Sequence, residues 1–185
     1  MSHSATSAGL YYSVLDGHIS QVEQYLKRGG NPNITNSNST SAIACASRLG
    51  HYDCVRILIQ NGADINKADD FGKTPVIYAC FEGYPDILKL LILHKPQINF
   101  QDIQGRTALM YTILQNNPNK TNEPLFYMLI EAGADIHLRD IHGYTALDYA
   151  MSRKKECLMM HQKLLIMTWD SQQTPQRKQR VIQTT

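Results

Sequence analysis

The chain has 185 residues, of which 18% are charged and 43% are hydrophobic, and this composition excludes a mostly disordered acidic or basic protein. The length suits a single domain of ordinary size. No run of eighteen apolar residues is present, so the sequence predicts no membrane span. Residues 1–5 lack the basic and apolar regions of a secretory signal, so we expect an intracellular protein.

The net charge of +2 comes from the C-terminal segment. When Asp170, Arg177, Lys178 and Arg180 are set aside, residues 1–168 hold equal numbers of basic and acidic side chains. A neutral body argues against a nucleic-acid-binding surface, because such a surface needs a basic face. The cysteines form neither a CxxC pair nor a zinc-spaced cluster, so they are predicted to be free buried thiols in a reducing compartment. They are Cys45, Cys54, Cys80 and Cys157.

A repeat of 33 residues runs through the chain. The pairs Gly17-His18 and Gly50-His51 lie 33 residues apart, and Gly83-Tyr84 lies 33 residues further on. The motif Gly-Ala-Asp-Ile at 62–65 recurs 71 residues later at 133–136, which corresponds to one ordinary unit and one lengthened by five residues. Because these features share one register, they indicate an array of stacked supersecondary units.

Each unit reads as a helix, a tight turn, a second helix and a hairpin. Thr74 and Pro75 have the cap and first-turn chemistry of a helix start, and this first helix is expected to end near Gly83. The second helix is more apolar and stops at Gly62 or its equivalents, where glycine accepts a positive φ. The Asp-x-x-Gly segments have turn chemistry and are predicted to form the hairpin tips. They lie at 69–72, 102–105 and 140–143.

Five units are expected in chain order within a domain of residues 1–168, and the first and last are degenerate, as capping units should be. Their approximate bounds are 6–35, 36–68, 69–101, 102–139 and 140–168. The third unit has Lys95-Pro96 where Gly-Ala is expected, and the fourth carries the insertion at about 117–121. The fifth has a long methionine-rich second helix, and 169–185 reads as a polar, weakly basic, disordered tail.

These features together resemble the ankyrin repeat family. The resemblance covers about residues 6–168, and it implies an all-α fold: an α-solenoid of stacked helix-turn-helix repeats with short β-hairpin-like loops. Its motifs are Thr-Pro-Val-Ile-Tyr-Ala at 74–79, Gly-His-Tyr-Asp-Cys-Val at 50–55 and Asn-Gly-Ala-Asp-Ile-Asn at 61–66. The family often places a histidine after the Thr-Pro-Leu triplet, and its replacement here puts the stability between repeats in question. The replacing residues are Tyr11, Ala44, Ile77, Met110 and Asp148.

The resemblance implies binding through a concave face formed by the hairpin tips and the exposed side of the first helices. Solvated tips should be polar, so apolar residues at these positions predict a strip for a partner across units three to five. The other interpretation is that some of these side chains pack against adjacent hairpins. The candidate partner-binding residues are Phe71, Lys73, Phe81, Glu82, Ile103, Arg106, Leu114, Ile141, His142 and Tyr144.

A tyrosine column is expected beside this strip. Tyr12, Tyr78, Tyr111 and Tyr149 hold one register in successive first helices, and Cys45 holds it in the second unit. Their hydroxyls could be free for a peptide backbone or carboxylate, or the column could be a packing feature whose hydroxyls reach water or local carbonyls. The packing interpretation is favoured.

No catalytic motif is present: the sequence has no GxSxG, Walker loop, HExxH or dinucleotide fingerprint. We therefore expect no enzyme activity, cofactor, metal site or small-molecule substrate. The neighbours Asp69 and Asp70 are interpreted as solvated turn residues. Leu58, Asp64, Ile65 and Asn66 resemble the pattern on which asparaginyl hydroxylases act, which makes Asn66 a candidate hydroxylation site, but the same residues are ankyrin consensus.

The sequence thus predicts a monomeric, non-enzymatic interaction module that binds a protein or peptide. It could be a stand-alone adaptor, an inhibitor, or an effector that a bacterium or virus directs into a host cell. Two alternatives stay open: the targeting half of an enzyme, and a nucleic-acid-associated regulator that uses the basic tail. The compartment is expected to be the cytoplasm, the nucleus or a host cell entered without a classical signal peptide.

Overall fold

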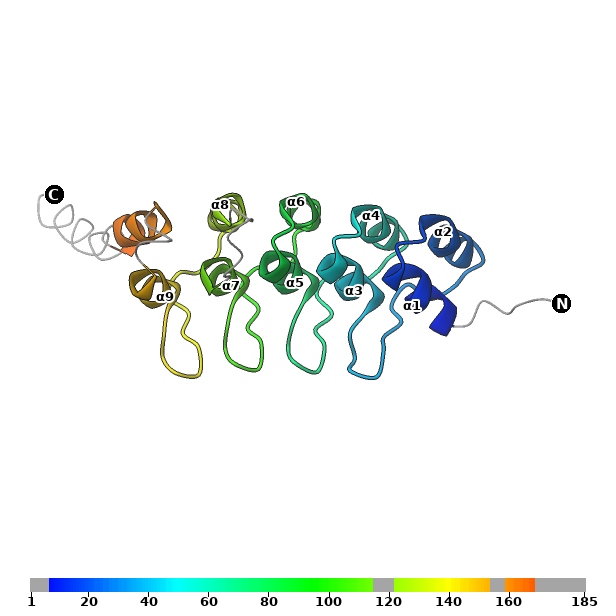
Figure 1. Ribbon diagram of the computed structural model, residues 1–185, viewed down its shortest axis with the longest axis horizontal. Helices are drawn as coiled ribbons and strands as arrows, with labels where there is room; N and C mark the ends of the chain where they lie inside the picture. Colours follow the sequence, from blue (N-terminus) through cyan, green and yellow to red (C-terminus); the bar gives the residue numbers. More distant parts are fainter. Residues whose placement is uncertain (1–6, 115–121, 154–158, 169–185) are drawn as a thin grey trace, which may run out of the picture.

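The computed structural model describes residues 7–114, 122–153 and 159–168. Its helices lie in two rows, and long hairpin loops project from one of them (Figure 1). The inner row, from which the hairpins project, holds α1 (Ser7–Leu15), α3 (Ala42–Leu49), α5 (Pro75–Glu82), α7 (Ala108–Leu114) and α9 (Ala146–Ser152). The outer row holds α2 (Ile19–Lys27), α4 (Tyr52–Gln60), α6 (Pro85–Leu93), α8 (Glu123–Glu131) and the helical residues 159–168.

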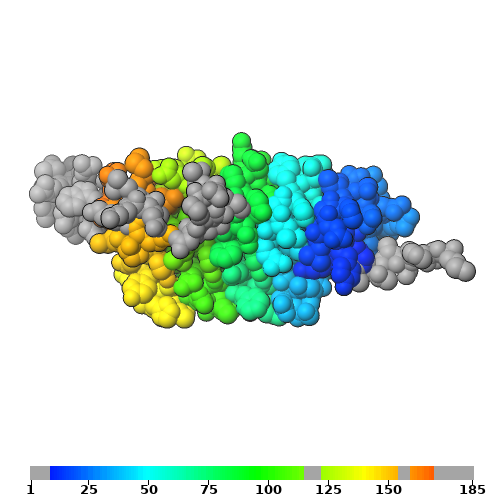
Figure 2. Space-filling model, in the orientation of Figure 1, coloured from blue at the N-terminus to red at the C-terminus, as the bar shows by residue number. Residues whose placement is uncertain are grey.

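The described residues form no β-strand, and Thr35 and Ser41 make only an isolated bridge. The predicted all-α solenoid of helix-turn-helix repeats is therefore confirmed. The units follow one another in chain order along the long axis (Figure 2). In the described part of the chain, no helix has both the length and the apolar content to cross a membrane.

Local sequence sets where the inner helices begin and end. The Thr74 hydroxyl accepts a hydrogen bond from the Ile77 N–H at 3.3 Å, and Pro75 follows at the first helical position. Gly83 then ends α5 with φ of 79°. This is the chemistry that the sequence predicts, because the cap satisfies an orphan amide and glycine adopts the left-handed conformation without a Cβ clash.

The apolar core runs continuously between the two rows. Inner helices pack on inner helices, from α3 to α5, α7 and α9, and outer helices pack on outer helices from α2 to α8. Leu88 and Leu91 of α6 are fully buried, and so is Phe126 of α8. A single helix pair could not bury these side chains, so stacking of neighbours supplies the core.

Three of the predicted free thiols lie in this core. Cys45, Cys54 and Cys80 are buried and form no disulfide. Burial raises the pKa of Cys54 to about 11, so its thiol stays protonated near neutral pH. Cys157, the insertion near 117–121 and the tail 169–185 lie outside the described residues.

The hairpin tips 69–72 and 102–105 each stack so closely on the next hairpin that glycine is required there. The Ile103 N–H donates to the Phe71 carbonyl at 3.1 Å, and the Ile141 N–H donates to the Gln104 carbonyl at 3.0 Å. Gly105 has φ of 71°, and a Cβ added there would lie 2.9 Å from the Asp140 Cα. The hairpin tips therefore form one continuous layer.

Polar side chains tie adjacent units to one another. A hydrogen bond of 3.1 Å joins His51 Nε2 to the Leu15 carbonyl. Asn33 Oδ1 accepts from the Asp64 N–H at 2.7 Å, and Asn66 Oδ1 accepts from the Gln97 N–H at 2.8 Å. The candidate hydroxylation site Asn66 is thus half-buried and engaged between units, and its modification stays a prediction.

The substitution of Lys95 for the expected glycine carries a conformational cost. Lys95 keeps the left-handed conformation of the motif, with φ of 55°. For a residue with a Cβ, that conformation costs about 1–2 kcal/mol.

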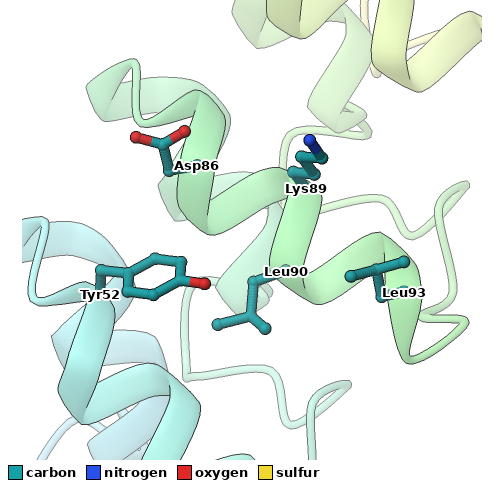
Figure 3. Close-up of a pocket in the computed structure, with 5 residues that line it drawn as sticks. All are labelled: Tyr52, Asp86, Lys89, Leu90 and Leu93. Atoms are coloured by element: carbon teal, nitrogen blue, oxygen red, sulfur yellow. The ribbon is translucent and has the colours of Figure 1, made fainter.

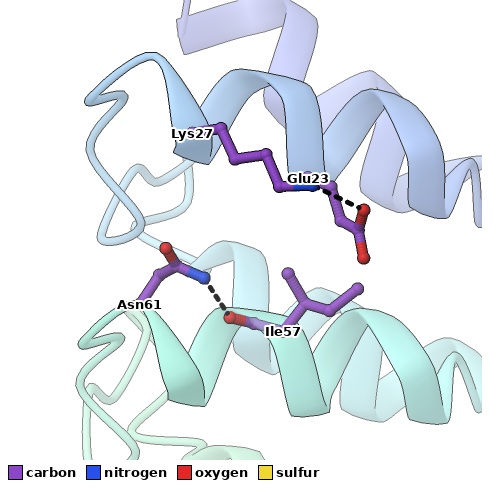
Figure 4. Close-up of polar contacts among 4 residues, drawn as sticks. All are labelled: Glu23, Lys27, Ile57 and Asn61. Atoms are coloured by element: carbon purple, nitrogen blue, oxygen red, sulfur yellow. Dashed lines mark hydrogen bonds and ion pairs between the residues drawn. The ribbon is translucent and has the colours of Figure 1, made fainter.

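The solvent side of the outer row carries local polar contacts. Lys27 pairs with Glu23 at 3.3 Å, and the Asn61 amide donates to the Ile57 carbonyl at 2.8 Å near the end of α4 (Figure 4). Arg56 and Asp53 form a second exposed ion pair at 3.1 Å. Such exposed helical pairs contribute about 0.3–0.5 kcal/mol each, so they mark a solvated surface and add little stability.

Candidate functional site

A pocket of about 300 Å³ opens between the hairpins of the third and fourth units, beside α5 and α7. We call the surface formed by the tips 69–72, 102–105 and 140–143, together with the adjoining side of the inner helices, the hairpin face. The pocket is lined by Phe71, Lys73, Phe81, Asp102, Ile103, Gln104, Arg106 and Tyr111. Five of the ten candidate partner-binding residues thus meet in one place.

One carboxylate shapes each of these hairpins. Asp102 Oδ1 accepts the N–H groups of Gln104 and Arg106, both at 2.9 Å, which closes the turn. Its Oδ2 accepts the Tyr111 hydroxyl at 2.5 Å. Asp69 does the same with Phe71, Lys73 and Tyr78, and Asp140 does so with His142, Tyr144 and Tyr149.

The interpretation of Asp69 as a solvated turn residue is wrong. Its side chain is buried, with 6% exposure, whereas Asp70 next to it is exposed. The reason is that Asp69 supplies hydrogen-bond acceptors to its own hairpin and to a tyrosine of the following helix, and both partners cover it.

These bonds also answer the question about the tyrosine column. The hydroxyls of Tyr78, Tyr111 and Tyr149 donate to aspartates of their own units, so they are not free to bind a partner through that proton. Burial raises the pKa of Tyr78 and Tyr111, and the aspartate hydrogen bond adds to the rise. These contacts agree with the packing interpretation, except that the hydroxyls reach carboxylates and not water or local carbonyls.

Tyr12 does not belong to the column. Its side chain is 65% exposed, and the half-buried Tyr11 instead contacts Cys45 of the next unit. Burial raises the pKa of Tyr11, and the neighbouring Cys45 raises it further. Asp69 accepts the Tyr78 hydroxyl, but residues 1–6 contain no aspartate that could accept the Tyr12 hydroxyl in the same way. This difference in sequence could have distinguished Tyr12 from the other tyrosines.

Lys73 lies among aromatic rings. Its Nζ is 4.7 Å from the Phe81 ring centroid, 5.2 Å from Tyr111 and 5.8 Å from Tyr78. Phe81 and Tyr111 meet edge to face, with centroids 5.4 Å apart. An ammonium over ring faces is attracted by their negative quadrupoles, so these rings hold the lysine at the pocket.

Arg106 is positioned by the next pair of tyrosines. Burial acts to lower the pKa of Arg106, but the hydroxyl oxygens of Tyr149 and Tyr111 lie close enough to its guanidinium to raise that pKa. Each of those phenols donates its proton to an aspartate and still has lone pairs to accept from Arg106. The Arg106 Nε is buried and has no hydrogen-bond partner among the described residues. Sequence reasoning selected Lys73 and Arg106 by position, but it did not reveal that tyrosines hold both.

The remaining candidates extend the surface beyond the pocket. Ile141 and Tyr144 lie on the hairpin of the fifth unit with 65% and 52% exposure, and the His142 and Tyr144 rings lie 6.4 Å apart. Glu82 and Leu114 are half-buried at the ends of α5 and α7. Together with Phe71 and Ile103, the exposed apolar side chains span three successive hairpins.

A second pocket on the outer row was not expected from the sequence. It has a volume of about 300 Å³ and lies between α4 and α6, where Tyr52 points toward Leu90 (Figure 3). Lys89, Asp86 and the exposed Leu93 complete it. The available signal was Leu93, a large apolar residue at the solvent-facing end of an amphipathic helix.

No metal-binding cluster occurs in the described ranges: nowhere there do three histidine, cysteine, aspartate or glutamate side chains gather in a way that could hold an ion.

Comparison with known proteins supports the repeat register. The family model of ankyrin repeats, which represents three copies, matches residues 10–102 and again 83–165. No curated protein matches the chain.

Proposed function

Because the chain belongs to the ankyrin repeat family, whose repeats are generally protein–protein interaction modules, we propose that it binds a protein or peptide through its hairpin face and catalyses no reaction. The observation that carries this proposal is the row of exposed apolar side chains on three adjacent hairpins. Phe71, Ile103 and Ile141 are 48%, 62% and 65% exposed, although hairpin tips normally present polar groups to water.

The surroundings of this row favour binding. The hairpins are joined to one another by backbone hydrogen bonds, and a buried aspartate closes each turn and ties it to its own helix, so the surface is formed before a partner arrives. A pre-formed surface loses little conformational entropy on association. The pocket beside Phe81 adds a concavity that could receive an anchoring side chain.

The more specific roles are part of the proposal. A stand-alone adaptor, an inhibitor and a host-directed effector would all use the same contact, and each would work inside a cell as a monomer. A role of the basic tail in nucleic-acid binding would involve 169–185, outside the described residues.

The test is affinity capture of partners from cell lysate with the full chain as bait. The double variant Ile103→Asp, Ile141→Asp places charges on the proposed surface, and Tyr144→Ala removes one aromatic anchor. We expect the double variant to capture no specific partner, and Tyr144→Ala to weaken binding by about 1–3 kcal/mol.

The control is Gln24→Ala on the exposed side of α2, which should capture the same partners. Thermal unfolding is measured for each variant, and a cooperative transition establishes that the variant is folded. Undiminished capture by a folded double variant would exclude the hairpin face as the binding surface.

A further inference from the structure

Arg48, Lys73 and Arg106 lie along the hairpin face, and in the described part of the chain none of them has an acidic partner. Within the described ranges the ion pairs are Lys27 with Glu23 and Arg56 with Asp53, both on the outer row. Arg48, Lys73 and Arg106 take part in neither, and they contact aromatic groups instead. The Arg48 Cζ lies 6.0 Å from the Tyr78 ring centroid, and Lys73 and Arg106 lie against the tyrosines described above.

Within the described residues, the nearby carboxylates form no ion pair with these cations. Asp69 and Asp102 are buried, and each already accepts two backbone N–H groups and one tyrosine hydroxyl. Among the described residues, neither Asp70 nor Glu82 lies within ion-pair distance of Lys73 or Arg106. Of the charged side chains that line the pocket, Lys73 and Arg106 are cationic and Asp102 is anionic, so the lining carries a net positive charge.

The two pocket cations are restrained in different ways. Three rings surround the Lys73 ammonium, which removes part of its hydration while giving it no counter-charge. Arg106 is half-buried, and its Nε lacks a partner. Partly desolvated cations of this kind gain more from a carboxylate than exposed ones do, because the lower local dielectric strengthens the attraction.

We propose that this pocket recognises an acidic side chain next to an apolar one in an extended peptide segment of the partner. The aspartate or glutamate carboxylate binds between Lys73 and Arg106. The neighbouring apolar side chain packs against Phe71 and Ile103, which line the same pocket. This inference rests on the proposed function and adds the chemistry of the partner to it.

The test selects peptides from a random library displayed on phage and fused through their C-termini, so that no free C-terminal carboxylate is offered. Selected sequences are synthesised with amidated C-termini, together with versions in which each acid is replaced by its amide and with scrambled versions of the same net charge. Fluorescence anisotropy gives the Kd of each peptide for the full chain and for folded Lys73→Met, Arg106→Gln and Lys73→Glu variants. Methionine preserves most of the aliphatic packing of Lys73 and removes only its charge.

We expect selected peptides to share an acid beside an apolar residue, and the amide versions to bind at least about tenfold more weakly, since truncating one member of a buried charge pair has a large effect. In Lys73→Met and Arg106→Gln this acid-to-amide ratio should fall toward one. Selection on Lys73→Glu should no longer favour acids.

Three results would overturn the inference and leave the proposed function intact. The first is that the peptides need Ile103 and Ile141 but contain no shared acid. The second is that the acid-to-amide ratio is unchanged in both Lys73→Met and Arg106→Gln. The third is a failure to select any peptide, since the proposed function also allows a folded protein partner. Peptides that bind the folded Ile103→Asp, Ile141→Asp variant as well as they bind the original chain would instead contradict the proposed function itself.

Discussion

At the scale of single residues, the site depends on a repeated pair of one aspartate and one tyrosine nine positions later. In the fourth unit the pair is Asp102 and Tyr111, and its hydrogen bond joins the hairpin to α7. The same tyrosine provides a ring to Lys73 and an acceptor to Arg106. One side chain therefore links the hairpin, the helix and both pocket cations.

Removing the hydroxyl of Tyr111 tests this link. Tyr111→Phe keeps the ring and leaves one buried Asp102 oxygen without its donor, so we expect a loss of about 1–2 kcal/mol in the free energy of unfolding. Tyr12→Phe is the matched control, because Tyr12 is exposed, and it should change stability by less than about 0.5 kcal/mol. Urea unfolding measures both, and equal effects of the two substitutions would contradict the assigned role.

At the scale of elements, helix caps and hairpin tips fix the frame that carries the site. The capping box of α9 joins Thr145 and Asp148: the Thr145 hydroxyl accepts from the Asp148 N–H at 3.3 Å, and Asp148 Oδ2 accepts from the Thr145 N–H at 2.8 Å. The backbone and hydroxyl donors of Thr145 lower the pKa of Asp148 in the folded chain.

This lowered pKa predicts a pH dependence. A carboxyl whose folded pKa is depressed stabilises the fold above its unfolded pKa, and that stability is lost as the pH falls from neutral into the acid range and through the folded value. At pH 7, Asp148→Asn should destabilise the chain by about 1 kcal/mol. The difference between the two proteins should shrink in acid.

Thermal unfolding over this pH range measures the effect, with Asp70→Asn at an exposed tip as the control. A constant difference at all pH values would show that the ionised carboxylate is not the stabilising group.

The hairpin glycines allow backbone strain to be separated from packing. Gly105 and Gly143 both have positive φ, 71° and 82°, but a Cβ at Gly105 would meet the Asp140 backbone at 2.9 Å, and one at Gly143 would meet nothing within 4 Å. Gly143→Ala should cost about 1 kcal/mol for its conformation alone. Gly105→Ala should cost about 1–3 kcal/mol more, because the next hairpin must shift.

Chemical denaturation gives both values under the same conditions. If the two variants lost the same stability, the tips would not be in the close contact described.

At the scale of the whole molecule, each unit depends on its neighbours for a core. Leu91 of α6 is fully buried between the rows, and Leu93 two residues later is 70% exposed. Leu91→Ala should cost about 2–5 kcal/mol, and Leu93→Ala should cost less than about 0.5 kcal/mol. Hydrogen exchange should show the loss of protection reaching α4 and α8, because solenoid stability depends on interfaces between neighbours.

An effect confined to α5 and α6 would mean that the units unfold independently.

The sequence by itself determined the features that depend on local chemistry. The 33-residue period gave the helix pairs, Thr74 and Gly83 gave the ends of α5, and Asp-x-x-Gly gave the hairpin tips. These could be predicted because caps and turns are set by neighbouring residues along the chain. The same register also gave ten candidate contact positions, since repetition places equivalent residues on one face.

Only the tertiary structure decided which of those positions form a site. Lys73 meets Phe81 of its own unit and Tyr111 of the next, and Arg106 meets Tyr149 of the unit after its own. Contacts between units depend on the spacing of the stack and on side-chain rotamers, neither of which a repeat register specifies. The same reason explains why Tyr11, and not Tyr12, contacts the next unit. Which tyrosine is buried depends on the side chains that pack beside it, and the position in the repeat does not specify these.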